Sequence, residues 1–363
     1  MIDIFADVGD AVRITLPERA RLRIGIIGAG AIVDVAHLPA YRALGLEVAA
    51  IADLDQAKAA DVAARHGIGS VYGDAEQLLA DPRVEVIDIA VTADAQPALA
   101  GAAIESGRPV LAQKPFAPDV ATGQRIVELA AERNVALAVN QQLRFDEGVA
   151  AAHRMIELGW IGEVTAMSIM VDIRTAFFDD WPWMRELDRV EITYHSIHYH
   201  DVIRWFLGEP DAVFCAAGRL PGQPGRGETR TISSYLYRSG VRALVHANHD
   251  NLHGDSSATF RIEGTAGAIR GTLGLLYDYP HGRPDTLELH STVLPTDGWL
   301  PYPVTTRWIP DAFGGPISSL LNHLADGTSL RSSGADNLGT LRLVEALYTS
   351  IDEARVVELT GRG

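Results

Sequence analysis

The sequence predicts an α/β domain with a doubly wound parallel sheet, followed by an α+β domain with a large, mainly antiparallel open sheet. At 363 residues the chain has the length of two domains. Apolar runs of strand length alternate with helical patterns over residues 21–139, which is typical of a parallel sheet covered by helices. After residue 145 strand-like runs follow one another directly, which indicates antiparallel pairing. We therefore expect domains at residues 21–143 and 144–363, with residues 1–20 as an N-terminal extension.

The first domain opens with a pattern for binding a dinucleotide. Residues 21–27 (RLRIGII) form a buried strand, Gly28-Ala-Gly30 a tight turn, and residues 31–44 a helix. Glycine at 28 permits the turn, glycine at 30 lets a pyrophosphate approach the backbone, and the helix N-terminus offers free N–H groups. The next strand ends on Asp53, about 25 residues after Gly28, where such units carry the acid that binds the ribose hydroxyls. Together these features indicate a Rossmann domain.

The other elements of this domain alternate regularly. Predicted helices cover residues 55–66, 75–79, 96–106 and 120–133, and predicted strands cover 46–52, 68–72, 84–91, 109–112 and 135–139. The ligand of a parallel sheet lies beyond the carboxyl ends of its strands. At those ends we expect the cofactor to be contacted by Gly28, Gly30, Ala31, Ile32, Asp53, Thr92, Gln96, Gln113, Lys114, Asn140 and Gln142.

The charge after the second strand favours NAD over NADP. Asp53 and Asp55 would repel a 2′-phosphate, and no arginine follows them immediately.

The second domain has a different order of elements. We predict helices at 147–158, 191–207, 316–324 and 337–351, a tryptophan-rich loop at 177–185, and strands at 163–174, 212–218, 229–237, 241–249, 258–263 and 268–272. Residues 1–20 match no part of the nucleotide unit and are expected to form an arm on a neighbouring subunit or a poorly ordered tail.

Composition excludes several classes of protein. The net charge of −16 argues against a nucleic-acid partner, because phosphate binding needs a basic face. No apolar run is long enough to cross a membrane, and no secretory apolar segment opens the chain. Cys215 is the only cysteine, so a disulfide within the chain and a cysteine-rich zinc site are excluded. These observations predict a cytoplasmic enzyme without membrane or nucleic-acid partners.

Two stretches carry residues suited to catalysis. Lys114 follows a predicted central strand at the cofactor edge, where its charge would stabilise a developing alkoxide. In the predicted helix 191–207, Tyr194, His198 and Asp201 share one stripe at i, i+4 and i+7.

The motifs of the chain resemble the glucose–fructose oxidoreductase, inositol dehydrogenase and MocA family of NAD(P)-dependent sugar oxidoreductases. The motifs, in order, are Gly28-Ala-Gly30 leading into His37-Leu-Pro, Lys114-Pro115, Gln142-Leu-Arg-Phe, His198-x-x-Asp201 with Trp205-Phe-Leu-Gly208, and Glu263-Gly-Thr-Ala-Gly-Ala-Ile-Arg. The resemblance covers nearly all of the chain after Ala20. It implies Lys114 and His198 as the catalytic pair and Asp201 as a substrate contact. It also implies a homodimer or homotetramer formed through the C-terminal sheet.

The chain departs from the family pattern at two positions. The family usually has glutamate before the lysine, where this chain has Gln113, and often has aspartate four residues before the histidine, where it has Tyr194. The run Gln113-Lys-Pro-Phe is similar to the branch that includes apiose dehydrogenases. We expect Tyr194 either to contact the substrate as an auxiliary acid or base, or to pack under the helix.

Structural interpretations compete with these roles. Lys114 can be a solvated lysine before a structural proline, and His198 a buried core histidine. His195, His198, His200 and Asp201 can form a metal cluster, but on a helix His200 points away from His198, so we predict no metal. Trp181 and Trp183 can pack a lid loop or support a sugar. We expect Tyr194, His195, Asp201 and Trp183 to contact the substrate.

Three functions are consistent with these residues. In the first, an NAD-dependent dehydrogenase oxidises a hydroxyl of a sugar, polyol or related small polyhydroxy substrate, or reduces the ketone, with His198 as the base and Lys114 holding the oxygen. In the second, a lyase or hydrolase keeps NAD bound and oxidises a glycoside transiently with the same two residues. The third is a non-catalytic protein that senses NAD.

Overall fold

The computed structural model describes residues 4–277, 279, 282–295 and 297–359. They fall into two compact units, each assembled from separate stretches of the chain. The six-strand unit contains residues 14–145 and 309–341. The nine-strand unit contains residues 1–13, 146–308 and 342–363, apart from those not described.

The six-strand unit is a parallel sheet in the order β3-β2-β1-β4-β5-β6. Its strands are β1 Ile24–Ile27, β2 Val48–Ala52, β3 Val71–Tyr72, β4 Val86–Ile89, β5 Val110–Gln113 and β6 Leu137–Asn140. The chain runs outward from β1 in one direction and then restarts beside it at β4, so the point where the order reverses lies between β1 and β4. This strand order confirms the predicted doubly wound sheet.

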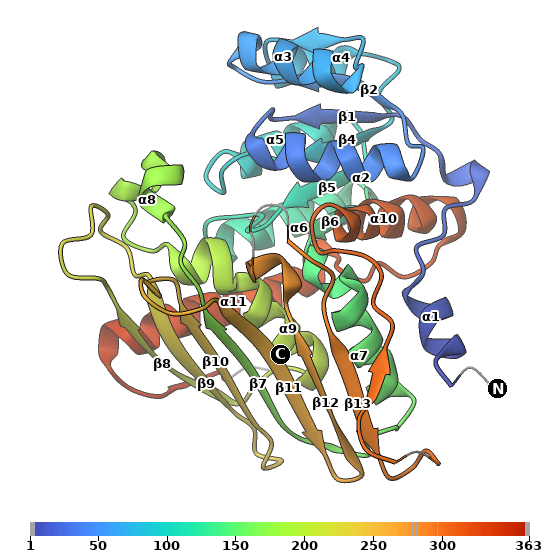
Figure 1. Cartoon of the computed structure of the whole chain (residues 1–363). Helices are drawn as coiled ribbons and strands as arrows, with labels where there is room; N and C mark the ends of the chain where they lie inside the picture. Colours follow the sequence, from blue (N-terminus) through green and yellow to red (C-terminus); the bar gives the residue numbers. More distant parts are fainter. Residues whose placement is uncertain (1–3, 278, 280–281, 296, 360–363) are drawn as a thin grey trace. The chain divides into compact units, whose positions relative to one another are not determined.

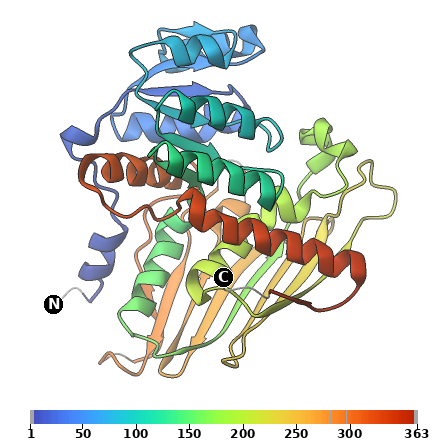
Figure 2. The ribbon, with the colours of Figure 1, turned by 180° about the vertical axis from the view of Figure 1, so that it is seen from behind.

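Helices cover this sheet, as Figures 1 and 2 show from opposite sides. They are α2 Leu38–Ala43, α3 Gln56–His66, α4 Ala75–Ala80, α5 Gln96–Glu105, α6 Val120–Glu132 and α10 Gly314–Asp326, with the first turns of α11 Gly334–Glu353. Short 3₁₀ turns occur at η1 Glu18–Ala20, η3 Gln142–Phe145 and η7 Asp311–Phe313. The predicted helix 31–44 contains a π-helical stretch, η2 Val33–His37, directly before α2.

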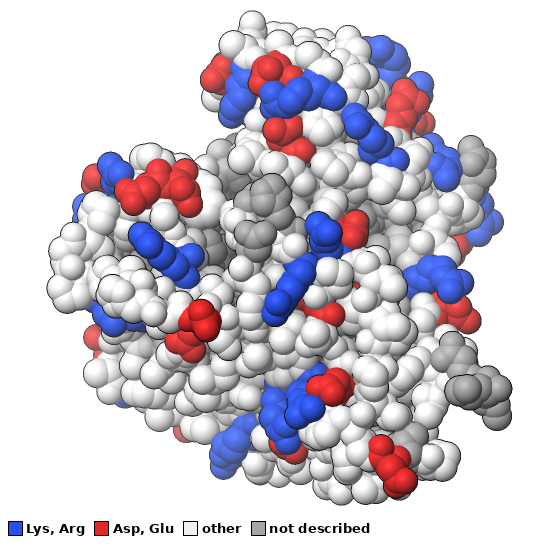
Figure 3. Space-filling view, in the orientation of Figure 1, with Lys and Arg blue, Asp and Glu red and all other residues white. Residues whose placement is uncertain are grey.

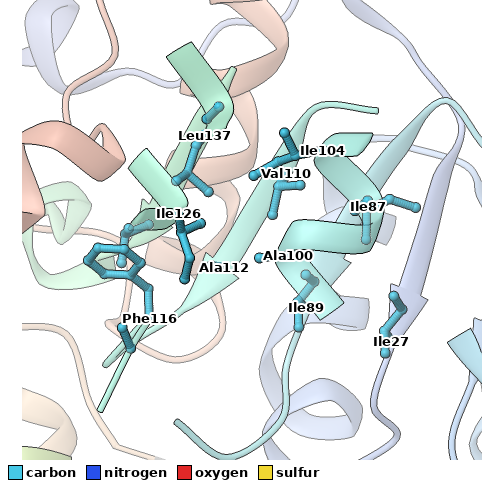
Figure 4. Close-up of a cluster of buried hydrophobic side chains, with 14 of the residues drawn as sticks. Ile27, Ile87, Ile89, Ala100, Ile104, Val110, Ala112, Phe116, Ile126 and Leu137 are labelled. Atoms are coloured by element: carbon cyan, nitrogen blue, oxygen red, sulfur yellow. The ribbon is translucent and has the colours of Figure 1, made fainter. Parts of the chain in front are cut away.

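The apolar core of this unit lies between β4, β5 and their helices. Side chains of Ile87, Ile89, Val110 and Ala112 on the strands face Ile104 and Ala100 on α5 (Figure 4). All four strand residues are fully buried, which matches the continuous apolar runs of a strand covered on both faces. This packing holds the carboxyl ends of the strands, where the candidate residues lie, in a rigid frame.

The nine-strand unit is a mainly antiparallel sheet in the order β14-β13-β12-β11-β7-β10-β9-β8-β15, in which only β7 and β10 run parallel. The strands are β7 Val164–Asp172, β8 Ala212–Gly218, β9 Arg230–Leu236, β10 Arg242–Asn248, β11 Ser257–Gly264, β12 Gly267–Thr272, β13 Leu287–Ser291, β14 Leu300–Tyr302 and β15 Val357–Glu358. The large antiparallel sheet was predicted; β13, β14 and β15 were not.

Helices lie against one face of this sheet and leave the other face open (Figures 1 and 2). They are α7 Glu147–Glu157, α9 Ile197–Leu207, preceded by a π-helical stretch, η5 Glu191–Ser196, and the later turns of α11. The predicted tryptophan-rich loop contains α8 Phe177–Asp180 and a 3₁₀ helix, η4 Pro182–Glu186. A further 3₁₀ turn, η6, covers Gly274–Tyr277.

The start of the described chain packs on its own unit. Helix α1, Ala6–Val12, lies against α7, and Val8 is fully buried. The Phe5 ring meets the rings of Trp160 and Tyr302 at centroid distances of 6.1 and 5.3 Å. The expectation of a poorly ordered tail is therefore wrong for these residues, because burial of Val8 and the ring contacts of Phe5 dock the segment on its own chain.

Candidate active site

The glycine turn after β1 has a backbone that only glycine adopts easily at its first position. Gly28 has φ of +107°, and its N–H donates to the Ala52 carbonyl at 2.7 Å. A Cβ atom on Gly28 would lie 2.4 Å from the backbone oxygen of Ala90. A Cβ on Gly30 would instead meet nothing within 4 Å. Gly28 therefore shapes the turn, whereas Gly30 leaves open space at the start of the following helix, as a pyrophosphate site requires.

Asp53 is held rigidly at the end of β2. Its carboxylate accepts hydrogen bonds from the backbone N–H groups of Ala29 at 2.7 Å and Asp55 at 2.9 Å, and Lys58 Nζ lies 2.8 Å from Oδ2. Burial acts to raise the pKa of Asp53, but the Lys58 and backbone hydrogen bonds hold it below its usual value. The ionised carboxylate can accept hydrogen bonds from ribose hydroxyls. Sequence reasoning missed Lys58, whose only signal was a cation in the first turns of the next helix.

The other predicted cofactor residues lie at the same carboxyl edge of the six-strand sheet. Ala31 and Thr92 are exposed, and Ile32 is half-buried. Asn140 and Gln142 are buried where β6 ends. Gln96 is fully buried, and its amide donates to the carbonyls of Gln113 and Pro115, so its side chain is engaged with the end of β5. Cofactor contacts by these residues remain predictions.

Lys114 directly follows Gln113, the last residue of β5, and is half-buried. Burial lowers the pKa of Lys114 to about 7. A lysine with such a pKa can exchange a proton near neutral pH, and in its charged form can stabilise a developing alkoxide. The Lys114 side chain is thus less exposed than the competing interpretation, a solvated lysine before a proline, expects.

In the nine-strand unit, the predicted helix 191–207 begins with the π-helical stretch η5 and becomes α-helical at α9. The expectation of one regular helix is wrong for these first turns. Glu191, the first residue of this stretch, is fully buried and accepts hydrogen bonds from Ser196 at 3.0 Å and Thr231 at 2.6 Å. The i, i+4 spacing of Tyr194 and His198 therefore crosses a change of helix type, so the predicted stripe is not a regular one.

The side chains predicted to bind substrate have distinct surroundings in this unit. Tyr194 meets the exposed ring of Trp183 edge-on at 5.3 Å. His195 is half-buried among aromatic rings, with its ring 4.1 Å from that of Phe177. His198 is buried and meets the Trp308 ring edge-on at 5.3 Å, and Asp201 is buried one turn further along α9.

Trp181 and His200 have structural roles instead. Trp181 packs against the apolar cluster of Phe177, Phe178, Met184 and Val190. His200 is fully buried between Ser196, at 2.9 Å, and the Tyr235 hydroxyl, and burial lowers its pKa to about 4. Within the described ranges, no three His, Cys, Asp or Glu side chains are arranged to hold a metal ion.

Sequence reasoning did not assign His249, which follows β10 beside His195. Its Nε2 lies 3.4 Å from Glu191 Oε1, its Nδ1 2.9 Å from Thr175 Oγ1, and its ring 5.3 Å from that of His195. No local pattern indicated this residue, because its partners lie far away in the sequence.

The surface carries no large field of one sign on the face drawn in Figure 3, where Lys and Arg side chains are interspersed with Asp and Glu. In the part of the chain that the structure describes, no helix is long and apolar enough to span a membrane.

The fold and the nucleotide turn define an NAD-binding oxidoreductase. A family described as an oxidoreductase family with an NAD-binding Rossmann fold matches residues 22–141, and the GFO/IDH/MocA C-terminal domain matches residues 149–270. The chain belongs to the GFO/IDH/MocA family, as the resemblance implied.

Curated relatives of the chain are dehydrogenases and reductases. A D-apiose dehydrogenase of Paraburkholderia graminis is 28% identical over 97% of this chain and 94% of its own length. An inositol 2-dehydrogenase of Burkholderia cenocepacia is 31% identical over 52% of this chain and 55% of its own length.

A solved structure is similar over nearly the whole chain. It is an oxidoreductase from Agrobacterium radiobacter in complex with NAD⁺, L-tartaric acid and magnesium, with a TM-score of 0.82 and 26% identity, covering 93% of this chain and 98% of that one. A levoglucosan dehydrogenase in complex with NADH and levoglucosan, at 22% identity, a TM-score of 0.78 and coverages of 94% and 100%, shows the same fold.

Proposed function

We propose that this protein is an NAD-dependent oxidoreductase that oxidises a hydroxyl of a sugar, polyol or related polyhydroxy compound, or reduces the corresponding ketone. The observation that carries the proposal is a half-buried lysine with a pKa of about 7 at a strand end of an NAD-binding oxidoreductase. Relatives that act on apiose and inositol support a polyhydroxy substrate. Since these relatives are dehydrogenases, they favour net oxidation or reduction over the lyase and hydrolase alternative.

The residues of the glycine turn fit a dinucleotide. The open space at Gly30 and the ionised Asp53 at the neighbouring strand end suit a pyrophosphate and a ribose respectively. Bound NAD supplies the hydride acceptor or donor. The remaining catalytic work falls to the side chains that bind the substrate and move its proton.

In the oxidation direction, Lys114 donates a hydrogen bond to the reacting oxygen and stabilises the charge that develops as the C–H bond breaks. His198 accepts the hydroxyl proton. Asp201, Tyr194 and His195 bind neighbouring hydroxyls, and the exposed face of Trp183 packs on the sugar ring. In the reduction direction the same groups return the proton to the carbonyl oxygen.

A panel of aldoses, polyols and lactones, incubated with NAD or NADP and followed at the NADH absorbance, tests this function directly. We expect turnover of at least one polyhydroxy compound with NAD. Lys114→Ala and His198→Ala should each lower kcat/KM by roughly 10²- to 10⁴-fold, with NAD affinity largely unchanged. Near-normal turnover in His198→Ala would show that another group is the base, and no turnover across the panel would favour a non-catalytic NAD-binding protein.

We also propose a homodimer or homotetramer formed through the open face of the nine-strand sheet. Phe214 on β8 and Ile232 on the adjacent β9 expose 38% and 49% of their surface, and such side chains favour contact with another copy. We place the protein in the cytoplasm, where NAD is recycled by other enzymes. Light scattering of wild type and of Ile232→Lys tests the assembly, and a mass of one chain for wild type would contradict it.

A further inference from the structure

A chain of buried polar side chains crosses the six-strand unit and ends at Lys114. It begins at Asp88, on β4, which is fully buried. Asp88 Oδ2 lies 2.7 Å from His37 Nδ1 and accepts a hydrogen bond from the Tyr41 hydroxyl at 2.7 Å. His37 is also fully buried and is the last residue of the π-helical stretch η2. One side of the His37 ring is therefore engaged with a carboxylate.

The other side of the His37 ring faces two amides. Nε2 of His37 lies 3.2 Å from Nε2 of Gln113 and 3.3 Å from Nδ2 of Asn140. The oxygen of the Gln113 side chain accepts the backbone N–H of Lys114 at 2.8 Å. Gln113 thus connects His37 to the backbone of Lys114.

The backbone N–H of Lys114 fixes the direction of the hydrogen bonds that run from Lys114 through Gln113 and His37 to Asp88. A backbone N–H can only donate, so the Gln113 oxygen must point to Lys114 and its NH₂ group to His37. Nε2 of His37 must then accept, which leaves the ring proton on Nδ1, where it donates to Asp88. A reversed Gln113 amide would place two donors against each other at Lys114.

We propose that Gln113 and His37 are positioning residues that hold Lys114 at the edge of the sheet. This inference rests on the proposed function, in which Lys114 contacts the reacting oxygen. His37 lies in the helical segment that follows the Gly28–Gly30 turn, so the hydrogen bonds link the backbone of Lys114 to the segment expected to bind the pyrophosphate. Gln96 holds the same backbone from the other side through the carbonyls of Gln113 and Pro115 at 2.8 and 2.7 Å.

Glutamine at position 113 sets which ring nitrogen of His37 carries the proton. A glutamate at 113 would still accept the Lys114 N–H but would face His37 with a second acceptor oxygen. In that variant we expect Nε2 of His37 to bind a proton as well, which gives a charged ring between two carboxylates. Gln113 avoids this additional pair of buried charges, on His37 and on residue 113, whose burial is costly.

Gln113→Met tests the positioning role, because methionine keeps the volume of the side chain and removes both hydrogen bonds. Gln141→Met is the matched control: Gln141 is another buried glutamine of the same unit, whose amide donates to Asn337 at 2.9 Å. We expect Gln113→Met to lower kcat by roughly 10- to 100-fold, since a small displacement of a reacting group has a large effect. NAD affinity, measured by calorimetry, should change less than about threefold, and the control should keep the wild-type kcat.

Two results of this comparison would overturn the inference. Equal kcat values in Gln113→Met and Gln141→Met would show that the hydrogen bond to Lys114 is dispensable. A loss of NAD affinity as large as the loss of kcat would instead support the cofactor contact that the sequence predicts for Gln113, and Gln113 would not be a positioning residue. Gln113→Glu, which restores the acceptor for the Lys114 N–H, should recover much of the kcat lost in Gln113→Met.

The protonation of His37 tests the hydrogen-bond directions without any substrate. In the ¹⁵N-histidine-labelled wild type, with His37 assigned by difference against His37→Asn, we expect a proton on Nδ1 and none on Nε2. Gln113→Glu should carry protons on both nitrogens. A proton on Nε2 in wild type would overturn the inference. Full activity of Lys114→Ala would instead refute the proposed role of Lys114, while the His37 spectrum still reports on the hydrogen bonds.

Discussion

Two alanine substitutions in the glycine turn should separate the shape of the turn from its contact with the cofactor. Gly28 has φ of +107°, and an added Cβ would lie 2.4 Å from the carbonyl oxygen and 2.9 Å from the carbonyl carbon of Ala90. Both are backbone atoms of the residue directly after β4 and cannot rotate away. Gly30 is only two residues further on, but an added Cβ there meets nothing within 4 Å and its φ is not in the glycine-only region.

These geometries give opposite expectations for stability and binding. Gly28→Ala should lower the free energy of unfolding by about 2–4 kcal/mol, from backbone strain and overpacking together. Gly30→Ala should leave it within about 0.5 kcal/mol of wild type. Because its methyl group fills the space that a pyrophosphate needs, Gly30→Ala should nevertheless weaken NAD binding at least tenfold, which is about 1.4 kcal/mol.

Urea unfolding followed by tryptophan fluorescence measures the first quantity, and calorimetric titration with NAD measures the second. Wild-type NAD affinity in a stably folded Gly30→Ala would refute the assignment of this turn to the pyrophosphate. A Gly28→Ala variant as stable as wild type would refute the argument from φ and from the Ala90 contact.

Three further predictions concern the cofactor, the stability and the substrate. Asp53→Ala should weaken NAD binding roughly tenfold and reduce the preference for NAD over NADP. Lys58→Met should increase that preference, because no cation then offsets the Asp53 carboxylate. Calorimetry with both cofactors measures these affinities, and a tenfold preference of wild type for NADP would contradict the assignment. Burial, together with the neighbouring carboxylate of Asp146, raises the pKa of Asp285 well above its usual value. The folded state therefore keeps a proton on Asp285 that the unfolded state releases. The stability that this proton contributes is lost as the pH rises above about 4 and through the raised pKa. Asp285→Asn keeps the hydrogen bonds without the titration, so its free energy of unfolding should fall less than that of wild type as the pH rises. Urea unfolding curves of the two proteins that shift equally with pH would contradict this prediction. Tyr194→Phe should cost roughly 1–3 kcal/mol in kcat/KM if its hydroxyl contacts the substrate, and unchanged kinetics with a stable fold would leave Tyr194 as a packing residue.

Local sequence patterns were sufficient for much of the fold and for the nucleotide turn. The strand before Gly28, the helix after it and Asp53 at the next strand end are neighbours in sequence, so residue types and spacing carried the information. The consecutive strands of the second half predicted a large antiparallel sheet for the same reason. The catalytic roles of Lys114 and His198 were inferred from the order of the motifs and from the position of Lys114 at a strand end, and they remain predictions.

Tertiary structure decided which polar groups meet. His37 binds Asp88 and Gln113, which lie 51 and 76 residues away along the chain, and no local pattern pairs them. The π-helical stretch before α9 begins at Glu191, whose carboxylate accepts a hydrogen bond from Thr231, 40 residues further on. Periodicity predicts which face of an element is buried, but a buried polar side chain takes its partner from whatever element packs against it. The sequence alone therefore determined the turn, the sheets and the candidate residues, and only the packed structure determined the hydrogen bonds that hold the backbone of Lys114 in place.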